Sequence, residues 1–249
     1  MSFWGLPVFA TLLIFARTGA VVMLLPGLGE AAIPPRIRLA FALALAVALG
    51  PLLGPSMPAP PAELGVAVGL IVTEILIGLM IGTVARILLS ALATAGEIVG
   101  METGLAFAQM TDPTQGQAGQ LIAIFLNLLG VTMIFATDLH HSFIAAIVGS
   151  YQAFALGQMP SFGDVAQMGI KAVGDAFRIG VQIAAPLMLA GIVFRLGLGV
   201  LSRLIPQIQV FFVAMPANVL GGFIIFALAL SGGVLVWLDR VEEFTRTLQ

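Results

Sequence analysis

Long stretches without a charged residue constrain this chain more than any other feature of its sequence. They include residues 39–62 and 204–238, each at least as long as the roughly 20 residues that a membrane-spanning helix needs. A water-soluble domain of this size could not bury so much apolar surface, because 60% of the residues are hydrophobic and only 9% are charged, with a mean hydropathy of +1.12. The sequence therefore predicts an integral membrane protein.

Apolar segments separated by short breaks predict an all-α fold with about six membrane helices. The breaks contain turn-forming pairs such as Pro26-Gly27, Pro34-Pro35 and Asp112-Pro113. We find no internal repeat. The expected segments cover residues 3–25, 39–53, 64–95, 121–148, 179–201 and 207–238.

One predicted helix is too long for a simple membrane span. No proline occurs between Pro61 and Pro113, and helical patterns run from residue 64 to about 110. As one helix with a rise of about 1.5 Å per residue it would reach roughly 70 Å, against about 30 Å of hydrocarbon. We therefore expect this helix to bend, break or leave the membrane.

The distribution of basic residues gives no orientation by the positive-inside rule. Almost equal numbers fall on the two sides when the loops are assigned alternately. One side would hold Arg36, Arg38, Arg86, Arg195 and Arg203, and the other Lys171, Arg178, Arg240 and Arg246. This balance suggests that some segments are not ordinary bilayer spans.

Small residues recur at four-residue spacing along the long predicted helix, which places them on one stripe. Such stripes let neighbouring backbones approach closely. Packing within the chain and contact with another subunit both account for the pattern, and the sequence does not separate them. The helix-packing candidates are Gly65, Gly69, Gly78, Gly82, Gly96 and Gly100.

Residues 96–120 form the least lipid-like interior stretch. Glu97, Glu102 and Asp112 are mixed there with glycine, methionine and glutamine. Two interpretations remain open for this stretch: a loop that lines or closes a pore, and a solvated connector.

Charged residues within apolar segments are candidates for function by default, because a charge is costly inside a membrane. Each of them could equally belong to a buried structural ion pair. Glu74 and Arg86 are twelve residues apart, about a third of a turn off the same face, so they cannot pair within one straight helix. We expect buried partners on other elements. The intramembrane candidates are Arg17, Glu74, Arg86 and Asp138.

Asp138, His140 and His141 are the one group whose residue types allow a metal site or a proton relay. Adjacent histidines point about 100° apart on a helix, and the chain contains only these two. We therefore expect polar residues at a helix end near the membrane surface, with no metal and no cofactor.

The sequence gives no support for thiol chemistry, for a known catalytic motif or for nucleic-acid binding. The chain contains no cysteine, which excludes thiolate ligands and disulfides, and it has no nucleophile-elbow, Walker or H-E-x-x-H motif. With a net charge of -2 and no basic run, it has no nucleic-acid footprint. We expect a protein that is not an enzyme and that takes any energy for transport from a partner or an ion gradient.

Five stretches occur in a characteristic order over nearly the whole chain. They are FARTGAVVMLLPGLGEAAIPPRIRLAFALALA, TEILIGLMIG, GEIVGMETGLAFAQMTDPTQGQ, HHSFIAAIVGSY and AAPLMLAGIVFRLGLGVLSRLIPQIQVFFVAMPANVLGGF. In this order the chain resembles the FliR/SctT-like family, the flagellar biosynthetic proteins and their counterparts in injectisomes, which are type III secretion export-gate subunits.

The resemblance implies a helical pore complex built with FliP and FliQ, beside FlhB and FlhA, in the bacterial inner membrane at the flagellar basal body. Unfolded flagellar proteins would pass through this pore. The resemblance also implies a FliP-like part over residues 1–175 and a FliQ-like helical hairpin over 176–249 with a short polar tail. Hairpins raised partly out of the bilayer would account for the overlong helix and the balanced charges.

The resemblance further implies that a loop of this chain, at about residues 96–120, plugs the pore. Flexible methionine and phenylalanine side chains can form a dry seal that yields to a passing chain, and glycine lets a loop move. The candidate plug residues are Met101, Gly104, Phe107, Met110, Asp112 and Pro113.

Three alternatives stay open. The chain could serve an injectisome instead of a flagellum. It could be a secondary transporter of small solutes, with Glu74 and broken helices around Pro186 or Pro216 forming a midplane site. It could also be a scaffold that only nucleates assembly, in which case the glycine stripes would matter and the plug residues would not.

Overall fold

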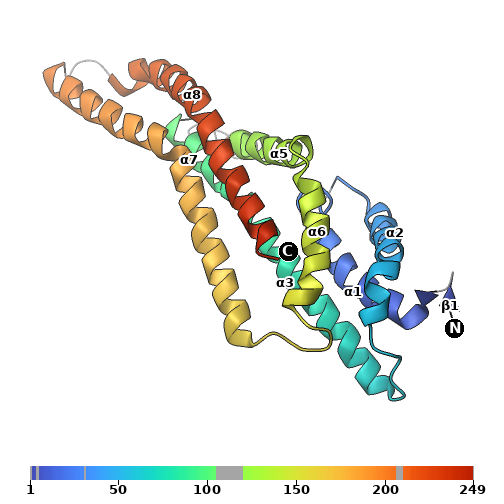
Figure 1. Ribbon diagram of the computed structural model, residues 1–249. Helices are drawn as coiled ribbons and strands as arrows, with labels where there is room; N and C mark the ends of the chain where they lie inside the picture. Colours follow the sequence, from blue (N-terminus) through green and yellow to red (C-terminus); the bar gives the residue numbers. More distant parts are fainter. Residues whose placement is uncertain (1, 4–5, 31, 105–119, 206–209, 249) are drawn as a thin grey trace. The chain divides into compact units, whose positions relative to one another are not determined.

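The computed structural model describes residues 2–3, 6–30, 32–104, 120–205 and 210–248. A short antiparallel pair of strands, β1 (Ser2–Phe3) and β2 (Leu6–Pro7), precedes the helices. Apart from this pair, the regular structure of the described residues is helical, which confirms the predicted all-α class (Figure 1). The helices are α1 (Val8–Leu24), α2 (Pro35–Leu53), the 3-10 helix η1 (Gly54–Ser56), α3 (Leu64–Glu102), α5 (Leu121–Ala136), α6 (Leu139–Ala153), α7 (Phe162–Leu204) and α8 (Val210–Arg246).

Three helices are much longer than the membrane is thick. The helices α3, α7 and α8 contain 39, 43 and 37 residues, so at about 1.5 Å per residue they reach roughly 55 to 65 Å against about 30 Å of hydrocarbon. The long helix expected from residue 64 therefore forms, without a break, as far as Glu102.

The number of helices that could span a membrane is lower than the predicted six. Among the described residues, four helices are long and apolar enough, or five if α5 and α6 count as one bent span. The predicted segment 121–148 breaks between these two helices with a bend of 76°, where Asp138 adopts the left-handed backbone conformation that aspartate tolerates (φ 60°). Helix α1, with 17 residues, is too short to count.

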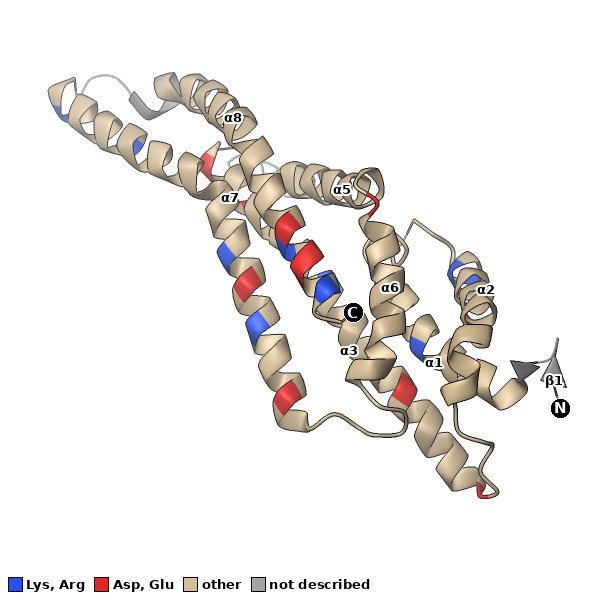
Figure 2. Cartoon of the chain, in the orientation of Figure 1, with Lys and Arg blue, Asp and Glu red and all other residues tan. Residues whose placement is uncertain are grey.

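The helix α7 begins well before the predicted segment 179–201. Its first half carries charges of both signs, as does the end of α8, so these stretches lack an apolar signal (Figure 2). The Ser161 hydroxyl accepts a hydrogen bond from the backbone N–H of Asp164 at 3.1 Å, and Asp164 lies in the first turn, near the positive end of the helix dipole. Capping at Ser161 therefore accounts for the start of α7 at a point where the sequence is not yet apolar.

The chain divides into two compact units. Unit 1 contains Met1–Leu88, Ile134–Val173 and Arg240–Gln249, and unit 2 contains Leu89–Met133 and Gly174–Asp239. Neither unit is one continuous stretch of the sequence, because α3, α7 and α8 each contribute residues to both.

In unit 1, helices α1, α2 and α6 share an apolar core, and α1 packs closely on α3. Ile14, Ala46 and Leu53 are buried in this core, with Val148 and Tyr151 against them. Two glycines of α3 permit the close approach of α1. A Cβ atom at Gly78 would lie 2.5 Å from the carbonyl oxygen of Arg17, and one at Gly82 would lie 2.8 Å from Cβ of Leu24.

In unit 2, helices α3, α5, α7 and α8 pack together, and Trp237 of α8 is fully buried. Glycine again marks the contacts: a Cβ atom at Gly130 of α5 would lie 3.2 Å from the Trp237 ring, and one at Gly180 of α7 would lie 3.0 Å from the Ala91 carbonyl oxygen. A Cβ atom at Gly96 would collide with the backbone of Ala123 on α5.

Only some glycines of the predicted stripe make close contacts within the chain. Gly78, Gly82 and Gly96 make close contacts inside the chain, and Gly100 is buried. Gly65 and Gly69, near the start of α3, would have nothing within 4 Å of an added Cβ atom. Their role in contact with another subunit stays a prediction.

A buried ion pair joins helices α1, α3 and α6 of unit 1. The Arg17 guanidinium donates from Nε to Oε2 of Glu74 at 2.7 Å and from Nη2 to Oε1 at 3.1 Å. Both side chains are 0% exposed. The expected partner of Glu74 on another element is therefore Arg17, and the pair has the bidentate geometry that makes such contacts strong.

The rest of the guanidinium binds the end of α6. Nη1 donates to the carbonyl and hydroxyl oxygens of Ser150 at 2.9 and 3.2 Å, and Nη2 donates to the carbonyl of Phe154 at 3.2 Å. All five N–H donors of Arg17 are thereby used. The carbonyls at a helix C-terminus lack partners within the helix and carry its negative dipole end, so a cation is favourable there. The guanidinium also lies 3.9 Å from the centre of the Tyr151 ring.

Replacing Arg17 with methionine should lower the free energy of unfolding by about 3 to 5 kcal/mol, because Glu74 would remain buried without its partner. The double variant Arg17→Met/Glu74→Met should be destabilised less than the sum of the two single variants. Denaturant unfolding of the detergent-solubilised protein, followed by circular dichroism, measures these differences. Arg86→Met, on the exposed face of α3, is the control. Additive effects of the two substitutions would contradict the coupling.

Candidate functional site at the end of helix α3

The described part of the predicted plug region is the end of α3, where the chain enters residues 105–119. Helix α3 ends at Glu102, and Gly104 follows with a φ of 82°, a left-handed conformation that glycine adopts without strain. Met101 is exposed and Gly104 is buried. The other predicted plug residues, Phe107, Met110, Asp112 and Pro113, lie outside the described residues.

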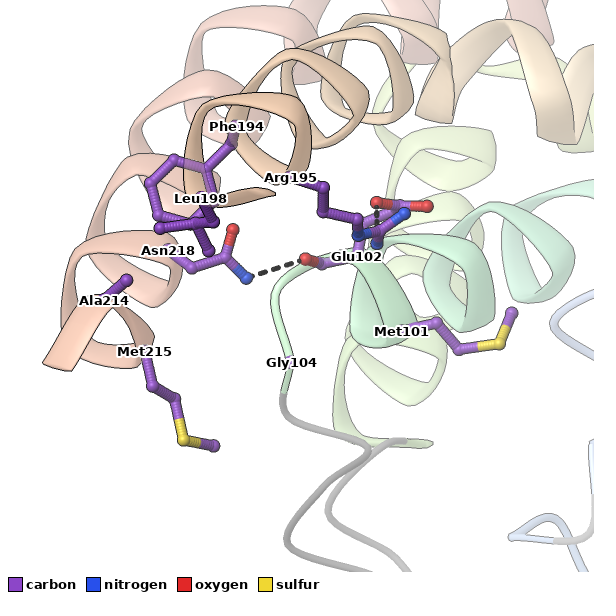
Figure 3. A pocket seen from close by; sticks show the side chains of 9 residues that line it. All are labelled: Met101, Glu102, Gly104, Phe194, Arg195, Leu198, Ala214, Met215 and Asn218. Atoms are coloured by element: carbon purple, nitrogen blue, oxygen red, sulfur yellow. Dashed lines mark hydrogen bonds and ion pairs between the residues drawn. The ribbon is translucent and has the colours of Figure 1, made fainter. Parts of the chain in front are cut away.

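Three helices of unit 2 meet at Glu102. Nη2 of Arg195 on α7 lies 2.6 Å from Oε2 of the Glu102 carboxylate, and Nδ2 of Asn218 on α8 donates to the Glu102 backbone carbonyl at 3.0 Å (Figure 3). We call these contacts the Glu102 clamp. One residue therefore fixes the last turn of α3 to both long helices, through its side chain and its backbone.

Glycines make room for the clamp. Gly191 lies one turn before Arg195 on α7, and a Cβ atom there would collide with the Glu102 carboxylate. On α8, a Cβ atom at Gly222 would lie 2.9 Å from the Thr103 side chain. The backbones of α7 and α8 thus come close to the end of α3 because these positions lack side chains.

The exposure of the clamp differs from that of the Arg17 pair. The Glu102 side chain is 15% exposed and the Arg195 side chain is 59% exposed, whereas Arg17 and Glu74 are fully buried. An exposed guanidinium keeps its solvation when its ion pair breaks, so the clamp can open at a much smaller cost than the buried pair.

An apolar pocket lies beside the clamp in unit 2. Its volume is about 70 Å³, far below the several hundred Å³ of most small-molecule sites. Figure 3 shows that its lining comes from α3, α7 and α8. Besides Gly104 and the clamp residues, the lining consists of Met101, Phe194, Leu198, Ala214 and Met215. This composition suits contact with apolar chain segments better than the binding of a polar solute.

Neither Arg195 nor Asn218 is among the site residues predicted from the sequence. Arg195 lies within the apolar segment 179–201, so the rule that selected Arg17 and Glu74 also applied to it. Asn218 carries no comparable signal, because an uncharged amide in an apolar segment is not unusual.

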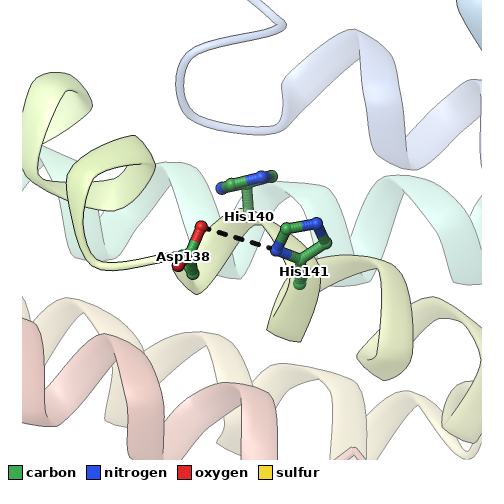
Figure 4. Close-up of side chains that lie close together, drawn as sticks. All are labelled: Asp138, His140 and His141. Carbon is green, nitrogen blue, oxygen red and sulfur yellow. Dashed lines mark ion pairs between the residues drawn. The ribbon is translucent and has the colours of Figure 1, made fainter.

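The remaining predicted charges lie in unit 1. Arg86 is exposed on α3, and Asp138 is exposed at the break between α5 and α6. Asp138 Oδ1 lies 3.7 Å from Nδ1 of His141 (Figure 4). Adjacent positions on a helix point about 100° apart, but the ring centres of His140 and His141 are 4.0 Å apart, so these side chains turn toward each other in the first turn of α6.

Comparison with known proteins adds the family. The family model described as "Bacterial export proteins, family 1" matches residues 8–244. The flagellar biosynthetic protein FliR of Caulobacter vibrioides is 46% identical over 236 residues, covering 95% of this chain and 94% of that protein. FliR of Aquifex aeolicus is 30% identical over 243 residues, covering 96% and 92%.

An injectisome protein is also similar, over a shorter stretch. The Yop proteins translocation protein T of Yersinia pestis is 29% identical over 151 residues, covering 59% of this chain and 57% of that protein. The similarity to the flagellar proteins is thus higher and covers nearly the whole chain. The chain belongs to family 1 of the bacterial export proteins, and within it to the flagellar FliR proteins.

Proposed function

We propose that this chain, a subunit of the flagellar type III protein export gate, forms an export pore together with FliP and FliQ. The observation that carries this proposal is the match to FliR proteins along almost the entire length of the chain. The pore would lie in the bacterial inner membrane at the flagellar basal body, beside FlhA and FlhB. Unfolded flagellar proteins are its proposed substrates.

The length of the helices supports a place in a larger complex. Helices of 37 to 43 residues extend well beyond the hydrocarbon. In unit 2, α7 and α8 also expose large apolar side chains that other subunits or lipid would cover. They include Leu189, Val193, Leu196 and Val200 on α7 and Leu220, Ile224, Leu228 and Leu235 on α8.

The proposed division assigns residues 1–175 to a FliP-like part and residues 176–249 to a FliQ-like hairpin. A hairpin requires two long consecutive helices that pack in opposite directions. Cβ atoms added at Gly222 and Gly233 of α8 would contact Leu187 and Ile183 of α7, respectively. Later residues of α8 thus meet earlier residues of α7, as in an antiparallel pair.

We propose further that the loop at about residues 96–120 plugs the pore, through its stretch from Met101 to Pro113, and that the Glu102 clamp holds the first part of this plug. The proposed plug residues are Met101, Gly104, Phe107, Met110, Asp112 and Pro113. The support is the position of Glu102, which directly follows Met101 and contacts both α7 and α8. We assign no catalytic activity to the chain, and energy for export would come from partners or an ion gradient.

A small-solute transporter receives less support. Both carboxylate oxygens of Glu74 accept hydrogen bonds from Arg17, so this residue is occupied by a structural partner. Helices α7 and α8 continue through Pro186 and Pro216, so the broken helices expected of a midplane solute site do not form at either proline. The shorter match to the Yersinia protein makes an injectisome role the weaker alternative as well.

Deletion of residues 104–112 should raise the ion permeability of membranes that contain the complete gate. The proposed plug would be lost while the helices that build the pore remain. Conductance of planar bilayers containing the purified complex measures this change. Deletion of residues 58–60, which are exposed between η1 and α3, is the control. If the plug deletion leaves the conductance of an assembled complex unchanged, residues 104–112 are not a plug, and the scaffold alternative gains support.

Breaking the Glu102 clamp should also increase leakage, without preventing assembly. Glu102→Gln and Arg195→Ala remove the ion pair, whereas the exchange Glu102→Arg/Arg195→Glu places opposite charges together again and should restore most of the seal. The same conductance assay measures the effect, with Arg203→Ala on the exposed end of α7 as the matched control. Wild-type conductance in both single variants would show that the clamp does not hold the loop.

A further inference from the structure

Three potential metal ligands converge at the break between α5 and α6. One donor atom from each of Asp138, His140 and His141 lies within 4.8 Å of the others. The three residues come from the left-handed link at Asp138 and the first turn of α6 (Figure 4). This arrangement belongs to unit 1 and is separate from the Glu102 clamp.

The separation of Asp138 and His141 is close to that of two ligands on one ion. Asp138 Oδ1 and His141 Nδ1 are 3.7 Å apart, beyond the range of a direct hydrogen bond. Two ligands of one tetrahedral zinc ion, each about 2.0 to 2.2 Å from the metal, are separated by roughly 3.3 to 3.6 Å. Small side-chain rotations would therefore bring both atoms to a common ion.

His140 supplies an independent observation. Its Nδ1 atom is shielded from solvent and has no hydrogen-bond partner among the described residues. A polar atom in that state normally finds a partner, and its absence calls for an explanation. In addition, the Asp138 side chain makes no capping hydrogen bond to α6, although it precedes the helix, so its carboxylate is available as well.

We propose that Asp138, His140 and His141 bind a divalent transition-metal ion of the zinc class, with water completing the coordination. One carboxylate and two imidazoles are ligands that zinc takes in proteins, and three protein ligands with one open position are a known pattern for this ion. Because Asp138 precedes α6 and both histidines lie in its first turn, the ion would hold the link at Asp138 to the start of α6.

The composition of the chain makes this proposal easy to test. Both histidines of the protein belong to the proposed site, and there is no cysteine. Any imidazole-bound metal in the purified chain must therefore be at this site, provided that purification avoids a polyhistidine tag. The protein is purified with a streptavidin-binding peptide tag, treated with a chelator and titrated with Zn²⁺ against a chromophoric competitor.

We expect about one Zn²⁺ per chain. His141→Ala, His140→Ala and Asp138→Asn should each weaken binding by more than about tenfold, because loss of an outer-shell partner alone costs that much. Glu63→Gln removes an exposed carboxylate elsewhere and should leave binding unchanged. His141 is exposed, so its replacement should leave the fold intact, which circular dichroism verifies. Absent binding, or equal binding by the His140→Ala/His141→Ala double variant, would overturn the proposal.

Discussion

The buried pair of Arg17 and Glu74 is the interaction on which the packing of unit 1 depends. In an apolar chain, two fully buried charges are tolerable only if each one satisfies the other. Arg17 meets this condition because it reaches Glu74 on α3 and the C-terminal carbonyls of α6 at once. Gly78 lets α1 lie close enough to α3 for this reach. Charge pairing and glycine packing therefore determine the same arrangement of helices.

The Glu102 clamp of unit 2 is built from the same kinds of residue, but its arginine is exposed to solvent. Glycines at 191 and 222 again allow close approach, and an arginine again pairs with a glutamate. The Arg195 side chain is 59% exposed, however, so breaking this pair does not leave a charge without solvation. A permanent contact suits the buried pair, and a reversible contact suits a segment that would have to move during protein export.

The sequence predicts most of the helices, because long apolar stretches and proline-rich breaks have a direct physical meaning in a membrane. It also predicts that Glu74 has a partner on another element, but not that this partner is Arg17, 57 residues away. The early start of α7 depends on capping by Ser161 and the bend at Asp138 on one backbone conformation, and neither gives a hydropathy signal. Arg195 could have been selected as a charged residue within an apolar segment, whereas nothing in the sequence distinguishes Asn218.

The proposed function requires this chain to assemble with FliP and FliQ. Co-expression of the tagged chain with the FliP and FliQ proteins of the same genome, followed by native mass spectrometry in detergent, tests this assembly. One large complex that contains all three proteins is expected. A stable monomer or homodimer that associates with neither partner would contradict it and would return attention to small-solute transport.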